Sequence, residues 1–364
     1  MWCGLCCSVS SAVYELFAVL EKEVVFKVLN VYNNSVLHQK GDCVTKEELK
    51  RLQSLPLEDK IALTKLRITE FYEQNNGNIV ISYSGGGDSS VLLHLTRQLY
   101  PEVKGVFCDT GLEFPEVKEH VKNTENIEII RPSMSYKQVL DRYGFVYPSK
   151  EVSRIIYYAR KGSQWAIYKL QGKNKDGEDD FYAQRFKNYA YLLDAPFKMH
   201  DQCCRVLKKD PFSKYVRNHN NVGMILGTRA EESVLRTQSY LKTGCINTKK
   251  NSATPIAFWM SSDILNYIVK YKVKIPTIYG EVKNGKYSGV QRTGCIFCPI
   301  GGIDEVLKEK HPKLYTYCME TLGLRKLYEW VAENKPKSQT LYTSKKEFDN
   351  RMGIGKPNSK ISKN

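Results

Sequence analysis

The residues best suited to chemistry form a stretch rich in glycine and serine, Ser82-Tyr83-Ser84-Gly85-Gly86-Gly87-Asp88-Ser89-Ser90. Consecutive glycines let backbone N–H groups approach a phosphate closely, and a helix that begins here adds the positive end of its dipole. The serine hydroxyls can donate hydrogen bonds to phosphate oxygens. Asp88 would repel a bare pyrophosphate, so we expect it to hold Mg²⁺ or an amide. The structural alternative is a glycine turn that caps a helix.

A second group comes from the 11 cysteines of the chain, an odd number that disulfides cannot use up. Cys295 and Cys298 form a CxxC pair in RTGCIFCPIG, where two thiolates can face one metal ion. For a four-thiolate site we expect the ligands Cys204, Cys245, Cys295 and Cys298. In an alternative set, Cys203 replaces Cys245. Zinc, a redox disulfide between the CxxC thiols, and inert buried cysteines remain open alternatives.

A weaker metal site is conceivable at the N-terminus. Cys3 and Cys6 form another CxxC, and His38 and Cys43 could complete a tetrahedral zinc site. A zinc ribbon normally has a second CxxC, which this segment lacks. Scattered thiols in a degenerate ribbon are the alternative.

The elements around these residues alternate between strands and helices. β-Branched or apolar runs predict strands at residues 79–83, 103–108, 127–130 and 222–226. Helical spacing predicts helices at 89–99, 115–123 and 262–271. This order predicts an α/β protein with a doubly wound parallel sheet, whose glycine-rich stretch follows its first strand.

The chain divides into four parts by composition. Residues 1–45 are a small cysteine-containing segment, and 46–250 form a nucleotide-binding domain with a helical insertion at about 150–200. Residues 251–335 form a helical part with the CxxC pair, and 336–364 a basic tail. The insertion combines basic residues with aromatic ones that could stack on exposed bases: Tyr157, Tyr158, Trp165 and Tyr168. An amphipathic helix packed on the core would show the same pattern.

The composition narrows the classes of partner and location. The chain has 55 lysines and arginines against 39 acidic residues, a formal net charge of +16. Such an excess favours a polyanionic partner, and we expect nucleic acid. No apolar run approaches the ~18 residues of a membrane span, so no membrane partner is expected. The first residues lack a basic stretch before their apolar part, so we predict no signal peptide and a cytoplasmic protein.

The motif SGGxDS after a β-branched strand resembles the N-type ATP pyrophosphatase superfamily, and in particular the phosphoadenosine phosphosulfate (PAPS) reductase family. Three further segments are similar to that family in the same order: DTGLEFPE at 109–116, CCRVLKKDP at 203–211 and GTRAEESVLR at 227–236. The resemblance implies a Rossmann-like sheet that binds ATP or another adenine nucleotide, with Arg229 and Arg236 as phosphate or substrate contacts. It also favours a [4Fe–4S] cluster over Zn²⁺ at the cysteines.

Together, the motif and the resemblance define a set of candidate site residues. We expect catalytic roles for Ser84, Asp88 and Arg229. The expected nucleotide contacts are Ser82, Ser84, Gly85, Gly86, Gly87, Asp88, Ser89, Ser90, Asp109, Thr110, Gly111, Arg229 and Arg236.

Two departures from the family pattern bear on function. Many sulfur-transferring relatives carry lysine where this chain has Gly87, and Lys208, Lys209 or Arg205 could replace that charge. Sulfonucleotide reductases end in a mobile ECG-x-H segment, whereas this C-terminal region has only Cys318, in YTYCMET.

These features indicate an ATP pyrophosphatase that adenylates an acceptor for iron–sulfur-dependent thiolation of tRNA or DNA, with a sulfur-donor protein as a further partner. The alternatives are a sulfonucleotide reductase that makes sulfite and a non-catalytic protein that binds nucleotide or nucleic acid.

Overall fold

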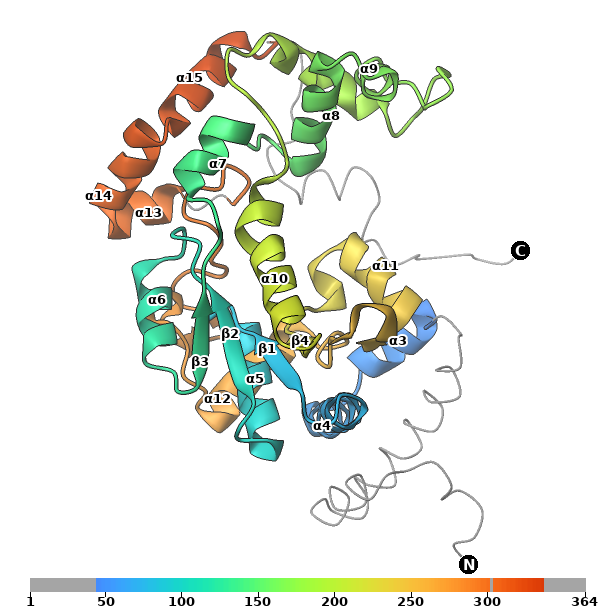
Figure 1. Ribbon diagram of the computed structural model, residues 1–364, viewed down its shortest axis with the longest axis vertical. Coiled ribbons are helices and arrows are strands. Elements are labelled where there is room, and N and C mark those ends of the chain that lie inside the picture. The colour runs from blue at the N-terminus through green and yellow to red at the C-terminus, as the bar shows by residue number, and fades with distance from the viewer. Residues whose placement is uncertain (1–43, 302–303, 337–364) are drawn as a thin grey trace, which may run out of the picture. The chain divides into compact units, whose positions relative to one another are not determined.

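The computed structural model describes residues 44–301 and 304–336 (Figure 1). The chain forms two compact units. The first contains the described residues up to Val139 and those from Cys204 to Pro312, and the second contains Leu140–Cys203 and the described residues from Lys313 onward. The expected N-terminal zinc ligands Cys3, Cys6, His38 and Cys43 and most of the expected basic tail lie outside the described residues.

The first unit is built on a six-stranded sheet of order β3-β2-β1-β4-β6-β5. All neighbouring pairs are parallel except β5 with β6. The strands are β1 (Ile79–Ser82), β2 (Lys104–Cys108), β3 (Ile127–Ile130), β4 (Gly223–Leu226), β5 (Ile246–Asn247) and β6 (Ser252–Ala253). The strand order reverses between β1 and β4, and open α/β sheets bind ligands at such a switch point.

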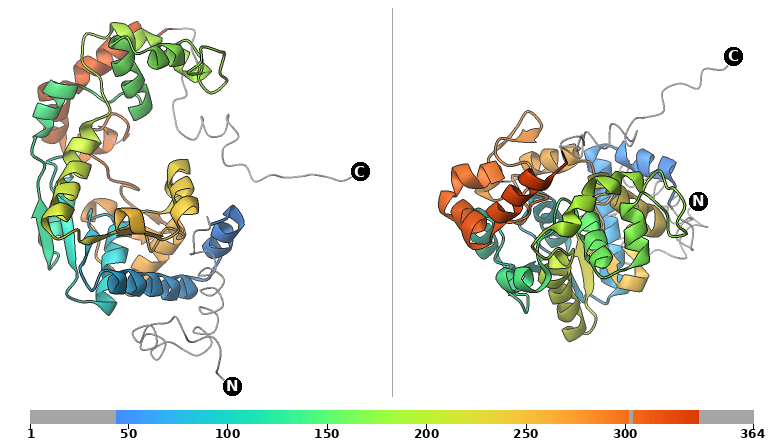
Figure 2. Two further views of the ribbon diagram at one scale, coloured as in Figure 1. Left: turned by 45° about the vertical axis from the view of Figure 1, so that its right-hand side comes forward. Right: turned by 90° about the horizontal axis from the view of Figure 1, so that it is seen from above.

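Helices pack against this sheet and against one another. The first-unit helices are α3 (Lys46–Gln53), α4 (Leu57–Gln74), α5 (Gly87–Leu99), α6 (Pro115–Lys122), α10 (Asp210–Asn218), α11 (Val234–Thr243), α12 (Ser261–Tyr271) and α13 (Asp304–Lys310). Short helical turns are η2 (Arg205–Lys209), η3 (Ala230–Glu232), η4 (Thr248–Lys250) and η5 (Thr277–Tyr279). The blue α4 lies beside the cyan α5 in both ribbon figures, and α5 also packs against α12 (Figure 2).

Apolar side chains join the sheet to α10. Val80 of β1 and Val106 of β2 are buried with Tyr215 of α10 and Val222 in one cluster. Ile81, the next residue of β1, is also fully buried. Because alternate residues of a strand face opposite sides, β1 is covered on both faces, which explains its continuous apolar run.

The second unit is mainly helical. It contains α8 (Lys150–Arg160), α9 (Gln164–Leu170), η1 (Gln184–Asp194), η6 (Tyr317–Thr321) and α15 (Leu324–Asn334), while α7 (Tyr136–Tyr143) and α14 (Pro312–Thr316) span its borders. The Arg160 guanidinium donates to four backbone carbonyls between Leu192 and Phe197. Trp330 of α15 packs on Tyr191 and Phe197, so the insertion and the C-terminal helix share one core.

The predicted α/β class and parallel sheet are confirmed. The strand predicted at 127–130 has the observed bounds, and the other predicted strands agree to within one residue at each end. Residues 281–304, where the sequence patterns above predict no strand, contain a two-stranded hairpin, β7 (Val282–Lys283) and β8 (Lys286–Tyr287). Across the described ranges, no helix combines the length and apolar character that crossing a bilayer requires.

Candidate functional site

The glycine-rich stretch forms the connection between β1 and α5. Gly85 has φ +73°, and a Cβ there would come within 2.9 Å of Val117 Cγ1 on α6, so the backbone conformation and the space both require glycine. Gly86 caps α5, which begins at Gly87. The first backbone N–H groups of a helix have no partner inside it, so this end of α5 is suited to bind an anion.

Serine hydroxyls tie the connection together. Ser89 Oγ donates to the Gly86 carbonyl over 2.9 Å and lies 3.0 Å from Ser84 Oγ. The Gly86 backbone N–H points to Ser84 Oγ at 3.4 Å. The loop is therefore closed by its own side chains, and Ser84 is its exposed hydroxyl.

A cleft of about 1370 Å³ opens over this loop. Its walls include the ends of β1 and β4, the start of α5 and the segment 285–294. Three carboxylates line it, against eight basic side chains: Lys208, Lys209, Arg217, Arg229, Arg236, Lys250, Lys286 and Arg292. This excess of positive charge makes the cleft a site for an anion larger than a single phosphate.

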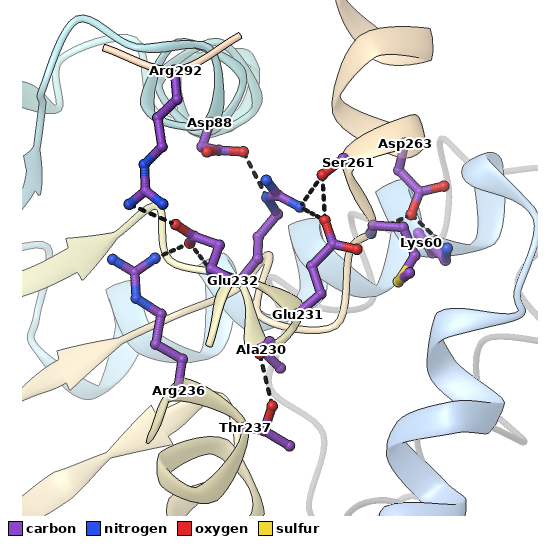
Figure 3. A network of polar contacts seen from close by, with 12 residues as sticks. Lys60, Asp88, Ala230, Glu231, Glu232, Arg236, Thr237, Ser261, Asp263 and Arg292 are labelled. Atoms are coloured by element: carbon purple, nitrogen blue, oxygen red, sulfur yellow. Dashed lines mark hydrogen bonds and ion pairs between the residues drawn. The ribbon is translucent and has the colours of Figure 1, made fainter. Parts of the chain in front are cut away.

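Arg229 anchors the polar network of the cleft, and Figure 3 labels its partners Asp88, Glu231 and Ser261. Its Nε donates to Asp88 Oδ1 over 2.7 Å, and its Nη1 reaches Glu231 and, over 3.2 Å, Ser261 Oγ. The guanidinium is buried, whereas the Asp88 side chain is 32% exposed. Asp88 is therefore held in place from behind and keeps one side open to a ligand.

The neighbouring carboxylate, Glu232, holds two further arginines (Figure 3). It forms ion pairs with Arg236 and, over 3.6 Å, with Arg292. Burial, followed by the positive charges of Arg292 and Arg229, lowers the pKa of Arg236. Because the arginines repel one another, an anion bound between them would be stabilised.

Most of the predicted nucleotide contacts lie where an anion could reach them. The cleft is lined by Ser82, Ser84, Gly86, Gly87, Asp88, Ser89, Arg229 and Arg236. Of the side chains proposed to replace the missing lysine, Lys208 and Lys209 also line it, and Arg205 does not.

The remaining predicted contacts have other partners. Ser90 is buried, with its Oγ 3.3 Å from the Tyr83 hydroxyl, and Gly85 faces α6. Asp109 pairs with Lys118 at 2.9 Å and accepts from the Gly111 N–H, while Thr110 donates to Glu113 over 2.6 Å. Gly85, Ser90, Asp109, Thr110 and Gly111 do not line the cleft, and their contacts shape the loops beside it, so their nucleotide contacts remain a prediction.

Three of the predicted cysteine ligands belong to one group beside the cleft. Cys204 precedes η2, and the Cys295 thiol lies in the electrostatic field of Cys204, Cys298 and Lys208. The Ile296 N–H donates to the Leu112 carbonyl over 2.8 Å, which holds the CxxC loop against the end of β2. Lys208 hydrogen-bonds Cys295 and also lines the cleft, so the cysteine group adjoins the anion site.

The structure separates Cys245 from this group, contrary to the preferred ligand set. Its buried Sγ lies 4.0 Å from the Tyr240 hydroxyl, and its other electrostatic partners are Arg67 and Glu70. Burial raises the pKa of the Cys245 thiol, which favours a protonated core residue. The alternative ligand Cys203 belongs to the second unit.

The donor types of the remaining cysteines fit a metal centre in kind, because thiolates suit iron–sulfur clusters and zinc. Among residues 44–301 and 304–336, however, no three His, Cys, Asp or Glu side chains are arranged to hold a metal ion. A metal would therefore have to draw the three thiols closer together.

The side of the cleft opposite the glycine loop was not predicted from the sequence. Tyr279, Tyr287 and Arg292 line the cleft from the segment around the β7–β8 hairpin. One signal was available, because the hairpin turns on Asn284-Gly285, both with positive φ, and this dipeptide favours a tight hairpin. The two-residue strands are too short for periodicity to reveal.

Comparison with known proteins agrees with the motifs. A family model described as "phosphoadenosine phosphosulfate reductase domain" matches residues 78–147 and 168–301. An uncharacterized Methanocaldococcus jannaschii protein, MJ0973, is 27% identical over 86% of this chain and 69% of its own length. A second from that organism, MJ0066, is 26% identical over 68% of this chain and 42% of its own length, so the chain spans less than half of it.

A relative with an assigned activity lies further away in sequence. The adenosine 5′-phosphosulfate reductase of Staphylococcus haemolyticus is 23% identical over 62% of this chain and 72% of its own length.

Proposed function

Because the chain belongs to the phosphoadenosine phosphosulfate reductase family, we propose that its cleft binds ATP and that the protein adenylates an acceptor, with release of pyrophosphate. The observation that supports this most is the convergence of the glycine loop with Arg229, Arg236 and Arg292 on one cleft. The backbone N–H groups of the loop would bind one phosphate. The arginines supply charge for the rest of a polyphosphate chain.

Each residue of the cleft would have a separate role in adenylation. An acceptor oxygen attacks the α-phosphorus, a new O–P bond forms, and the bond from that phosphorus to the pyrophosphate oxygen breaks. Ser84 and the backbone N–H groups of the loop bind phosphate oxygens, and Asp88 would hold the Mg²⁺ that accompanies the nucleotide. Arg229 orients Asp88, and Arg236 offsets the negative charge on the departing pyrophosphate.

The cysteine group supports sulfur transfer as the second half of the reaction. Cys204, Cys295 and Cys298 would supply three thiolates. A [4Fe–4S] cluster or Zn²⁺ held by them would supply a metal with affinity for sulfur beside the anion site. In the overall transfer, sulfide replaces the adenylated oxygen of the acceptor, and AMP leaves with that oxygen. A sulfur-donor protein would bring the sulfide.

Charge supports nucleic acid as the acceptor. Lys209, Arg217, Lys250 and Lys286 line the cleft in addition to the arginines near the loop, which is more positive charge than ATP needs. The chain as a whole carries +16. We therefore place tRNA or DNA at this rim, in a cytoplasmic setting where thiols stay reduced.

Pyrophosphate release tests the proposal. Protein purified without oxygen and supplied with MgATP should release pyrophosphate only when an acceptor RNA or DNA is present. Asp88→Asn should lower this rate at least about 100-fold, because the position of the metal is lost. The matched control is Glu119→Gln, an exposed carboxylate on α6, which should leave the rate unchanged. Absence of release with every acceptor tested would contradict the proposal.

A sulfonucleotide reductase is the second candidate, supported by the similarity to the adenosine 5′-phosphosulfate reductase of Staphylococcus haemolyticus. The one cysteine that follows the CxxC pair, Cys318, is 1% exposed on η6, which is a poor position for a thiol that attacks a sulfonyl group. Sulfite formed from adenosine 5′-phosphosulfate or its 3′-phosphate with thioredoxin would favour this candidate. ATP binding without turnover of either kind would favour a non-catalytic protein.

A further inference from the structure

The hydroxyl of Tyr287, a residue of strand β8 in the hairpin, occupies the space above Gly87. A Cβ added to Gly87 would overlap the Tyr287 hydroxyl, and one added to Gly86 would come within 3.2 Å of the Tyr279 hydroxyl. The two rings lie with their centroids 4.9 Å apart. The glycines of the loop therefore do more than permit a turn, because they make room for two phenols from a segment about 200 residues away in the sequence.

The two hydroxyls differ in their partners. Tyr279 Oη lies 2.8 Å from Thr293 Oγ1, whereas Tyr287 bonds to Gln291 through its backbone N–H and carbonyl only. Burial, followed by the negative charge of Asp88, raises the pKa of Tyr287, so its phenol keeps its proton. Tyr287 thus presents a donor at the start of α5, in the cleft that it lines.

From this geometry we infer that Tyr287 is a specificity-determining residue, which donates a hydrogen bond to the anion held by the glycine loop in place of a charged side chain at position 87. The inference rests on the proposed nucleotide site and deepens it. Its ligand class is a phosphate group of a nucleotide, recognised by a neutral donor from the hairpin. The hairpin must then lie over the loop for binding to be complete.

Two variants separate this role from simple packing. Tyr287→Phe removes only the hydroxyl and should weaken ATP binding about tenfold, as expected for a hydrogen bond to a charged group. Tyr72→Phe is the matched control, because its hydroxyl pairs with Glu102 away from the cleft, and it should change affinity less than about twofold. Both affinities are measured by calorimetry on the full chain, with thermal melting to check the fold.

A double-mutant cycle tests the geometric claim. Gly87→Ala should weaken ATP binding more than about tenfold in the natural chain, because its methyl group displaces the Tyr287 hydroxyl. In the Tyr287→Phe background the space is open, so the same change should cost less than about threefold. An equal loss in both backgrounds, or full affinity in Tyr287→Phe, would overturn the inference. A natural chain that binds no ATP would overturn the proposed site instead.

Discussion

Two acid–base pairs of the first unit differ in their surroundings. Lys60 of α4 and Asp263 of α12 approach to 2.6 Å, and Arg229 and Asp88 to 2.7 Å. The Lys60 side chain is 2% exposed and also donates to the Gln53 carbonyl, while Asp263 accepts from the Met260 N–H. Both side chains of the first pair are engaged in contacts that join α3, α4 and α12. The second leaves the Asp88 carboxylate partly open to the cleft.

Burial and the number of partners, rather than the length of the ion pair, distinguish the two pairs. A fully enclosed pair stabilises the fold, because removing one partner leaves a buried charge unpaired. A half-open pair costs less to disturb and can exchange one partner for a ligand. The two pairs should therefore respond in opposite ways to substitution.

The largest expected effect is on the enclosed pair. Lys60→Met should lower the free energy of unfolding by about 3–5 kcal/mol, because Asp263 loses its partner while it stays buried. Urea unfolding of the full chain measures this change, and Lys270→Met, at the exposed pair with Glu58, is the control, expected to have little effect. ATP affinity of the folded Lys60→Met protein should stay within about twofold of the natural chain. Wild-type stability in Lys60→Met would remove the distinction between the pairs.

A smaller effect, confined to binding, is expected at the open side. Arg236→Gln should weaken ATP binding about tenfold, because one charge-assisted contact is lost. Its unfolding free energy should hardly change, since Glu232 keeps Arg292 as a partner. Calorimetric titration with ATP and urea unfolding of the same preparation measure both quantities. A large loss of stability with unchanged affinity would make Arg236 a structural residue.

The part of the site formed by neighbouring residues could be predicted from the sequence, but the contacts between distant segments could not. Ser84 to Ser89 lie within one strand–loop–helix motif, where neighbouring residues determine the geometry. The pairing of Glu232 with Arg292 joins residues 60 positions apart and depends on how the segments pack. Cys245 illustrates the same limit, because its spacing suggested a ligand whereas packing placed it beside Arg67 and Tyr240.

The fold was easier to predict than the site for a related reason. β1 and the second half of β2 are buried on both faces, so residues 79–81 and 106–108 form apolar runs that the sequence displays. β5 and β6 have two residues each, and so few residues carry no periodicity. β6 forms by pairing with β4, and β5 forms by pairing with β6, so neither strand follows from its own composition.

The smallest expected effect concerns Asp109, whose pair with Lys118 is also half-open but lies off the cleft. Burial alone would raise the pKa of Asp109, but hydrogen bonds from Lys118 and the Gly111 N–H, with the charge of Arg131, lower it overall. A carboxylate whose folded pKa is lowered stabilises the protein above its unfolded pKa, and that stability is lost as the pH falls through the folded value.

Asp109→Asn should therefore reduce stability by less than about 1 kcal/mol at pH 7. Thermal melting at decreasing pH should show the difference from the natural chain shrink below the ordinary aspartate range and vanish only where Asp109 of the natural chain is protonated in the folded state as well. A difference that persists in acid would mean that the Asp109 charge is not its cause.

The central claim is that this cleft is an adenine-nucleotide site. Calorimetric titration of the full chain with MgATP at two salt concentrations tests it directly. We predict a dissociation constant below about 1 mM that rises with salt, and a loss of binding in Gly85→Ala, whose methyl group would press the loop against Val117. No heat of binding and no ATP-dependent rise in melting temperature, in a folded natural chain, would contradict it.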